Sequence, residues 1–199
     1  MSNVFYHPSG NVGFSSFNLQ QNLVSFIDKQ GQPVDSLAIP NKLNRDFWEN
    51  AGISDNPLIL HYNPYHKKIV VAARFENFIA VIDQQGNPVF KLEGAPLKSD
   101  GSWDKYESFY TIQSDQEFIY CLYTGGSIGA YDKELKRFKP NYPKKLFVFD
   151  WKGLARYEIN LSHEVIFLKL DADRERLIGK TQEFENGLII YDLSALKKK

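Results

Sequence analysis

A single cysteine, Cys121, is present in the 199-residue chain, which excludes an internal disulfide and a zinc cluster built on cysteines. The 24 basic residues equal the 24 acidic ones, so the net charge gives no reason to expect nucleic acid or an anionic membrane as partner. No apolar run reaches the roughly 18 to 20 residues of a membrane-spanning helix. The 13 glycines and 9 prolines are too few for a low-complexity chain, and the 43% hydrophobic share is too high for a disordered one. The composition is that of a globular protein.

A secretion signal is not recognisable in the first ten residues, which lack a basic region, an apolar stretch and a small-residue cleavage site. Taken literally, this predicts a cytoplasmic location.

An internal repeat is the most informative feature of the sequence. Four segments share a short apolar run that ends in aspartate: Asn22–Pro33, Asn77–Pro88, Lys145–Gly153 and Asn186–Asp192. The runs are rich in Val, Ile, Phe and Tyr, which favours strands over helices. In the first three segments a glycine follows the aspartate, and this pair of residues is typical of a hairpin turn. Each segment therefore predicts a strand that enters a tight turn.

Two further apolar runs precede each segment, such as Val165–Leu170 and Arg176–Lys180 before the fourth one. In the first three units another short strand follows the turn, so that the repeating unit has four strands. The marker aspartates Asp28, Asp83, Asp150 and Asp192 recur at intervals of about 40 to 70 residues, and a four-stranded antiparallel unit of this kind is the signature of a propeller blade. A β-sandwich does not require such self-similarity. The sequence predicts an all-β fold, a β-propeller of about four blades in one domain. The expected blades are about 1–40, 41–96, 97–163 and 164–199.

The fourth unit predicts only three strands, the third of which ends near Leu193. We expect an open array that forms the C-terminal part of a longer propeller. A self-closing four-bladed ring and a truncated gene remnant are the alternatives. The open sheet edges of such an array would favour self-association.

The third unit resembles a known family. The segments Phe118–Gly125, Lys145–Gly153 and Tyr157–Leu161 resemble the TolB-like six-bladed β-propeller proteins of Bacteroidetes, in which a "yiYaLYsG" strand leads through a variable loop to a "VFDWdG" strand and turn. The resemblance covers roughly residues 58–193. It implies six blades, of which this chain holds four, and a family whose members are usually exported, often as lipoproteins.

Three long connections are expected on one face of the propeller, because they join the second strand to the third or the fourth strand to the next unit. They are 41–57, 94–107 and 125–144. The candidate ligand-binding residues in or beside them are Phe47, Trp48, Trp103, Tyr106, Tyr131, Arg137, Phe138 and Tyr142. Such rings suit a protein surface or the face of a sugar. The alternative is that the rings only cover the ends of the blades.

Basic side chains are frequent in residues 132–145, where six Lys and Arg stand against Asp132 and Glu134. Together with the neighbouring rings they are compatible with a phosphate- or nucleic-acid-binding loop. With zero net charge overall, a solvated loop is the preferred interpretation, and no nucleic-acid partner is expected.

Catalytic patterns are sparse. The four histidines His7, His61, His66 and His163 share no metal-type spacing. Asp171 and Asp173 are better explained by a hairpin turn than by a calcium loop, and Cys121 is expected to be a buried, inert thiol. We therefore expect no catalytic residue, no metal and no cofactor. The predicted function is a non-enzymatic binding module for a protein or glycan, and the alternative is a metal-dependent lactonase or lyase with an axial site, for which His61 lies on an innermost strand.

Overall fold

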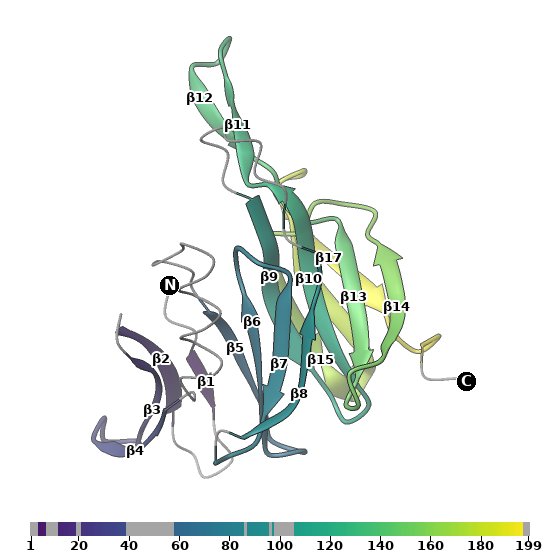
Figure 1. The fold of residues 1–199 in the computed structure, drawn as a ribbon. Coiled ribbons are helices and arrows are strands. Elements are labelled where there is room, and N and C mark those ends of the chain that lie inside the picture. The colour runs from purple at the N-terminus through teal and green to yellow at the C-terminus, as the bar shows by residue number, and fades with distance from the viewer. Residues whose placement is uncertain are drawn as a thin grey trace. The chain divides into compact units, whose positions relative to one another are not determined.

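The computed structural model is built of antiparallel β-strands that are joined mostly by short turns (Figure 1). It describes residues 4–6, 12–18, 21–38, 58–85, 87–95, 97 and 106–196. The chain divides into two units, one formed by residues 1–73 and 78–93 and the other by residues 74–77 and 94–199. Within the described residues, no helix has the length and apolar character needed to cross a membrane.

The first unit contains two four-stranded sheets in which each strand pairs with the next along the chain. The first sheet consists of β1 (Val4–Tyr6), β2 (Val12–Asn18), β3 (Gln21–Ile27) and β4 (Pro33–Ala38). The second sheet consists of β5 (Leu58–Asn63), β6 (Lys68–Ala73), β7 (Phe78–Ile82) and β8 (Pro88–Glu93). The leading strands of the two sheets, β1 and β5, contact each other.

The second unit repeats this topology with one insertion. The third sheet consists of β9 (Tyr106–Ser114), β10 (Phe118–Ser127), β13 (Lys145–Asp150) and β14 (Ala155–Asn160). The insertion between β10 and β13 is the hairpin of β11 (Gly129–Asp132) and β12 (Arg137–Pro140). The fourth sheet consists of β15 (Phe167–Asp171), β16 (Arg176–Lys180) and β17 (Leu188–Asp192), and the 3-10 helix η1 (Ala172–Arg174) connects β15 to β16. The leading strands β9 and β15 contact each other.

One turn recurs between the third and fourth strands of three sheets. The Oδ1 atom of Asp28 accepts hydrogen bonds from the backbone N–H of residues 30 and 32, Asp83 does so from residues 85 and 87, and Asp150 from residues 152 and 154, all at 2.8–2.9 Å. The strand register shifts at the equivalent residue each time. An aspartate suits this position because its carboxylate replaces backbone acceptors in the turn. The repeat predicted from the sequence is therefore a repeat of three-dimensional structure.

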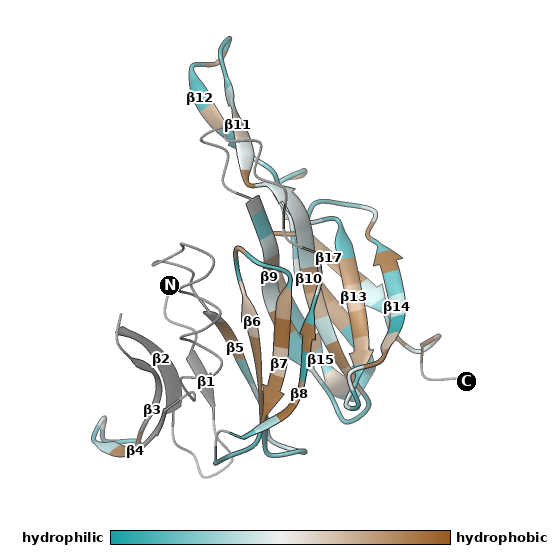
Figure 2. Ribbon diagram, viewed as in Figure 1, coloured by the Kyte–Doolittle hydropathy of each residue, from teal (hydrophilic) through white to brown (hydrophobic). Residues whose placement is uncertain are grey.

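Burial distinguishes the middle strands of a sheet from its last strand. Every residue of β7 is buried, and only Lys68 of β6 is not, whereas β8 alternates between exposed and half-buried side chains. Figure 2 shows the hydrophobic residues concentrated along β7 and the hydrophilic ones at the turns. Strands that are buried on both faces need continuous apolar runs, which is the pattern that the sequence shows there.

The third and fourth sheets share a core. Tyr120, Leu122, Leu146 and Val148 from the third sheet form one cluster with Leu168 and Leu177 of the fourth. These residues lie at alternate positions of their strands, so one face of each sheet is committed to this core. The cluster also includes Leu161 and Val165, from the connection between the two sheets, and Leu193.

The structure differs from the sequence prediction at two points. The first strand of the fourth sheet begins at Phe167 and not at Val165, because the N–H of Val165 donates to the carbonyl of Pro143 at 2.9 Å, outside the sheet. The connection 125–144 is not a plain loop, because it contains the β11–β12 hairpin.

Candidate functional site

The β11–β12 hairpin brings two predicted rings together. Tyr131 lies directly opposite Phe138, and Asp132 lies opposite Arg137. Asp132 Oδ1 accepts hydrogen bonds from the backbone N–H groups of residues 134 and 135, at 3.0 and 2.9 Å, which closes the turn. The side-chain pair Tyr131–Phe138 is a cross-strand aromatic pair, an arrangement that stabilises a two-stranded ribbon.

The apolar side chains of this hairpin are exposed. Tyr131 is 61% exposed, Leu135 58% and Phe138 51%, although each is large and hydrophobic. Four basic residues surround them, against the two acidic residues Asp132 and Glu134: Lys133, Lys136, Arg137 and Lys139. Clustered exposed apolar side chains with a polar rim are typical of an interaction surface. We name residues 129–140 the aromatic hairpin.

The base of the aromatic hairpin is held by hydrogen bonds. Asn141 donates through its backbone N–H to the carbonyl of Ile128 at 2.9 Å, and the Ser127 hydroxyl donates to the carbonyl of Gly129 at 2.8 Å. Gly129 has φ of 150°, and a Cβ there would collide with the carbonyl of Lys139 and the ring of Phe138. Only glycine fits this crossing point, so the aromatic hairpin leaves the third sheet in a defined direction.

An ion pair between a half-buried arginine and a buried glutamate lies at the start of β9. The Nε of Arg74 donates to Oε1 of the buried Glu107. Burial raises the pKa of Glu107, and the hydrogen bond and charge of Arg74 oppose that rise. The Arg74 guanidinium also lies 5.5 Å from the centre of the Tyr110 ring, and Tyr110 packs edge-to-face on Tyr142 with 6.3 Å between the ring centres. Tyr142 is therefore half-buried against Tyr110 and is not part of the exposed Tyr131–Phe138 pair.

Asn77 connects several segments beside this ion pair. Its Oδ1 accepts hydrogen bonds from the hydroxyls of Ser108, at 2.6 Å, and Tyr123, at 2.8 Å. Its side-chain amide donates to the carbonyl of Ala95 at 2.6 Å, and its own carbonyl accepts from the N–H of Gly94 at 2.7 Å. The Asn77 side chain thus joins β9, through Ser108, to β10, through Tyr123, and to Ala95 beyond the end of β8.

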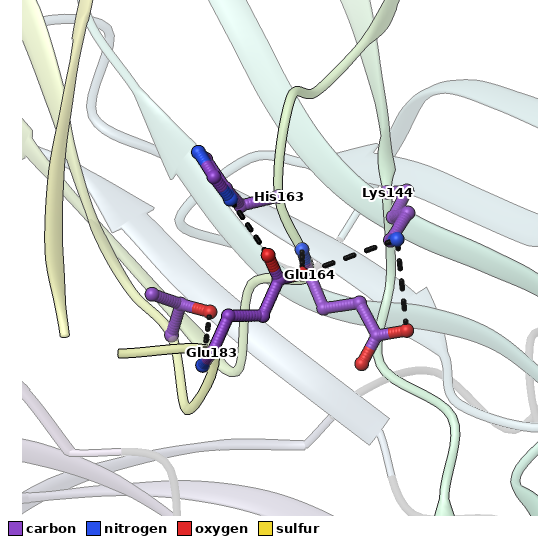
Figure 3. A network of polar contacts seen from close by, with 5 residues as sticks. Lys144, His163, Glu164 and Glu183 are labelled. Carbon is purple, nitrogen blue, oxygen red and sulfur yellow. Dashed lines mark hydrogen bonds and ion pairs between the residues drawn. The ribbon is translucent and has the colours of Figure 1, made fainter. Parts of the chain in front are cut away.

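A second polar network lies next to Tyr142 in sequence (Figure 3). His163 Nδ1 and Glu183 Oε2 are 2.7 Å apart, and the N–H of Glu164 donates to Glu183 Oε1 at 2.7 Å. Lys144 Nζ lies 3.8 Å from Glu164 and 3.9 Å from Glu183. The N–H of Glu164 and the His163 ring lower the pKa of Glu183. The network ties the connection between β14 and β15 to the one between β16 and β17.

The predicted site residues have different outcomes. Phe47, Trp48 and Trp103 lie outside the described residues, and Tyr106 is the first residue of β9, opposite Ser127. Tyr131, Arg137 and Phe138 lie together on the aromatic hairpin, and Tyr142 is separate from them. Sequence reasoning missed Arg74, Asn77, Glu107 and the partners of His163. The side chains of these residues bond to partners 18 to 46 residues away, and no local pattern marks them.

The residues weighed for other chemistry are in the expected places. Cys121 is buried, and burial raises the pKa of its thiol. Asp171 lies in a hairpin turn, where its Oδ2 accepts a hydrogen bond from Arg176 Nε at 2.8 Å. In the part of the chain that the structure describes, no three His, Cys, Asp or Glu side chains gather as a metal site.

Solved structures identify the fold. Neither a family model nor a curated protein matches the chain. A protein from Lactobacillus plantarum matches with a TM-score of 0.55 and 14% identity over 99% of this chain and 52% of that one. The periplasmic gluconolactonase of Pseudomonas aeruginosa matches with a TM-score of 0.53 and 12% identity over 95% of this chain and 48% of that one. Structures of this group are β-propellers, and the sheets of this chain have the topology of propeller blades.

The chain has a β-propeller fold. The fold-class prediction is therefore confirmed. The chain spans about half the length of the propellers that it matches. At these identities the likeness shows the fold alone.

Proposed function

We propose that this β-propeller protein is a non-enzymatic binding module that recognises a protein or glycan through the face carrying the long connections. The supporting observation is the aromatic hairpin, on which Tyr131, Leu135 and Phe138 are all more than half exposed. An aromatic pair offers a large contact area at a small cost in side-chain entropy.

The surroundings of the aromatic hairpin support this role. Four basic residues against two acidic ones give its tip a positive balance, which favours a partner with an acidic surface and speeds encounter with it. The hydrogen bonds of Ser127 and Asn141 fix the hairpin base, so little ordering is required on binding. Trp103, Phe47 and Trp48 on the other two long connections are proposed as further contacts.

The domain organisation belongs to the same proposal. We propose one propeller domain with blades at about 1–40, 41–96, 97–163 and 164–199, forming the C-terminal part of a TolB-like six-bladed propeller. The resembling segments Phe118–Gly125 and Lys145–Gly153 contribute the paired strands β10 and β13 and the turn after Asp150, so the family motif corresponds to the centre of one blade.

A propeller enzyme with an axial site is the second candidate. It draws support from Glu107, a buried carboxylate with a raised pKa at the start of the leading strand β9. The fold is shared with the Pseudomonas protein named a gluconolactonase. The argument against this candidate is that the Glu107 carboxylate already forms an ion pair with Arg74. Metal analysis of the purified protein separates the two candidates, because a stoichiometric divalent ion would favour the enzyme.

Alanine replacement of Tyr131 and Phe138 tests the binding proposal. The variant Tyr131→Ala/Phe138→Ala is immobilised beside the wild type and exposed to an extract of the source organism and to a glycan array. Tyr65→Ala is the matched control, since Tyr65 is 64% exposed but lies in a short turn of the second sheet. We expect the wild type and the control to retain a partner that the double variant loses at least tenfold. Equal retention by all three proteins would refute the proposal.

A further inference from the structure

The two faces of the aromatic hairpin differ in chemistry. Side chains at directly opposite positions of an antiparallel pair lie on the same face of the ribbon, and those of neighbouring positions lie on opposite faces. The register therefore gives one face Gly129, Tyr131, Phe138 and Pro140, and the other face Ala130, Asp132, Arg137 and Lys139. The two rings are thus confined to one face of the ribbon, and the basic residues of its strands to the other.

The turn of the hairpin adds an apolar side chain and two lysines. Leu135 is more than half exposed and lies between Lys133 and Lys136, in the four residues that join β11 to β12. In Figure 1 the hairpin extends away from the strands of the third sheet, with this turn at its far end. The tip of the projection is therefore both apolar and basic.

The basic residues of the hairpin are available to a ligand. All four are exposed, and none of them forms an ion pair with another described residue. They stand against only Asp132 and Glu134, and Asp132 accepts hydrogen bonds from the backbone of the turn. The zero net charge of the whole chain therefore conceals a local positive excess beside the exposed rings.

This combination suits the surface of a lipid bilayer better than that of a protein. Lysine is depleted in protein interfaces, and a stable interface takes about 20–30 residues from each partner, more than the hairpin offers. Amphipathic helices that bind a bilayer surface carry Phe and Leu on one face and Lys and Arg on the other. The same two-sided pattern on a ribbon meets the same physical requirement, because anionic headgroups attract the basic residues and a small apolar area then suffices.

We propose that the aromatic hairpin attaches this protein to an anionic lipid bilayer. Tyr131, Leu135 and Phe138 enter the headgroup layer, where aromatic side chains are favoured, and the four basic residues contact the anionic headgroups. The hydrogen bonds of Ser127 and Asn141 hold the base, so the two faces are formed before the bilayer is reached. The proposed protein or glycan partner uses the same hairpin, but neither proposal requires the other.

Vesicle flotation tests the attachment. The full chain is mixed with vesicles of phosphatidylcholine alone, or of phosphatidylcholine and phosphatidylglycerol in equal parts, and the bound fraction is measured over a range of lipid concentrations. The variant Tyr131→Ala/Phe138→Ala removes the rings. The variant Lys133→Glu/Lys136→Glu reverses two charges in the turn and leaves the ring pair intact, so it remains informative if loss of the rings loosens the hairpin.

Each variant has a matched control outside the hairpin. Tyr65→Ala removes an exposed ring from a turn of the second sheet. Lys67→Glu/Lys152→Glu makes the same change of charge at two exposed turn residues of the second and third sheets. Circular dichroism confirms that every variant is folded.

We expect the wild type and both controls to bind the anionic vesicles at least tenfold more tightly than the neutral ones, and each hairpin variant to lose at least tenfold in affinity for the anionic vesicles. The proposal is overturned if the wild type does not bind them, or if either hairpin variant binds them as the wild type does. Titration with polyglutamate covers the alternative partner: equal affinity of the wild type for this acidic polypeptide, with the same loss in both hairpin variants, would identify an acidic protein surface and also overturn the proposal.

The outcome is separable from that of the proposed function. The vesicles contain neither protein nor glycan, so their failure to bind leaves the proposed function standing. A wild type that retains nothing from the extract or the glycan array leaves the attachment to lipid standing in the same way.

Discussion

Two neighbouring residues of β16 provide the sharpest test of the register described for the fourth sheet. Leu177 is fully buried in the core shared with the third sheet. Ile178 is half-buried on the opposite face and lies beside the exposed Ile190. Side chains alternate between the faces of a strand, so a register slip of one residue would exchange their environments. We therefore compare Leu177→Ala with Ile178→Ala.

The expected free-energy changes follow from these environments. Removing the Leu177 side chain leaves a cavity among Tyr120, Leu168 and their neighbours, and a buried Leu→Ala change costs about 2–5 kcal/mol. Ile178→Ala removes as many carbon atoms from a half-buried site that opens no core cavity, and we expect a loss of about 1 kcal/mol. The difference between the two variants is thus about 2 kcal/mol.

Urea unfolding followed by circular dichroism measures this difference. With an m-value of about 2 kcal/mol/M, a loss of 3 kcal/mol lowers the midpoint by about 1.5 M. The m-values must agree among the three proteins for the comparison to hold. Equal losses, or a larger loss for Ile178→Ala, would refute the face assignment of β16.

Two further predictions concern the candidate site. Burial raises the pKa of Glu107 above its ordinary value of 4.5, so the folded state binds a proton at this carboxylate more tightly than the unfolded chain does. The stability that this proton contributes is therefore present below pH 4.5 and is lost as the pH rises. Relative to Glu107→Gln, the wild type should lose free energy of unfolding between pH 4 and neutrality, and a pH-independent difference would contradict this. Gly129→Ala should disrupt the aromatic hairpin because its Cβ meets the Lys139 carbonyl, while the sheets remain intact. Faster amide hydrogen exchange confined to residues 129–140 is the expected result, and unchanged protection there would show that the crossing tolerates a side chain.

The parts of the fold that sequence reasoning predicted are those encoded locally. Asp28, Asp83 and Asp150 mark their turns because the carboxylate bonds backbone groups only two and four residues away. The strand lengths follow equally from short apolar runs. The glycine-rich start of the aromatic hairpin, by contrast, resembles a loop, and the pairing of β11 with β12, with Tyr131 opposite Phe138, is not marked by a local pattern.

The polar contacts of the site could not be predicted in this way. Arg74 and Glu107 are 33 residues apart, and Tyr123 lies 46 residues from Asn77. In the sequence Tyr142 resembles the nearby exposed residues Tyr131 and Phe138, and only its packing on Tyr110 distinguishes it from them. Such pairings depend on how strands from different segments meet, which a single sequence does not reveal.

Nearest-neighbour strand order has a consequence for how the protein forms during synthesis. In the first, second and fourth sheets every strand pairs with one that precedes or follows it directly in the chain, and in the third sheet only the aromatic hairpin intervenes. Pairing of these strands therefore requires the closure of only short loops of the chain, which favours fast folding. We expect each sheet to assemble as it emerges from the ribosome, in order from the amino terminus, without waiting for the residues still to be translated.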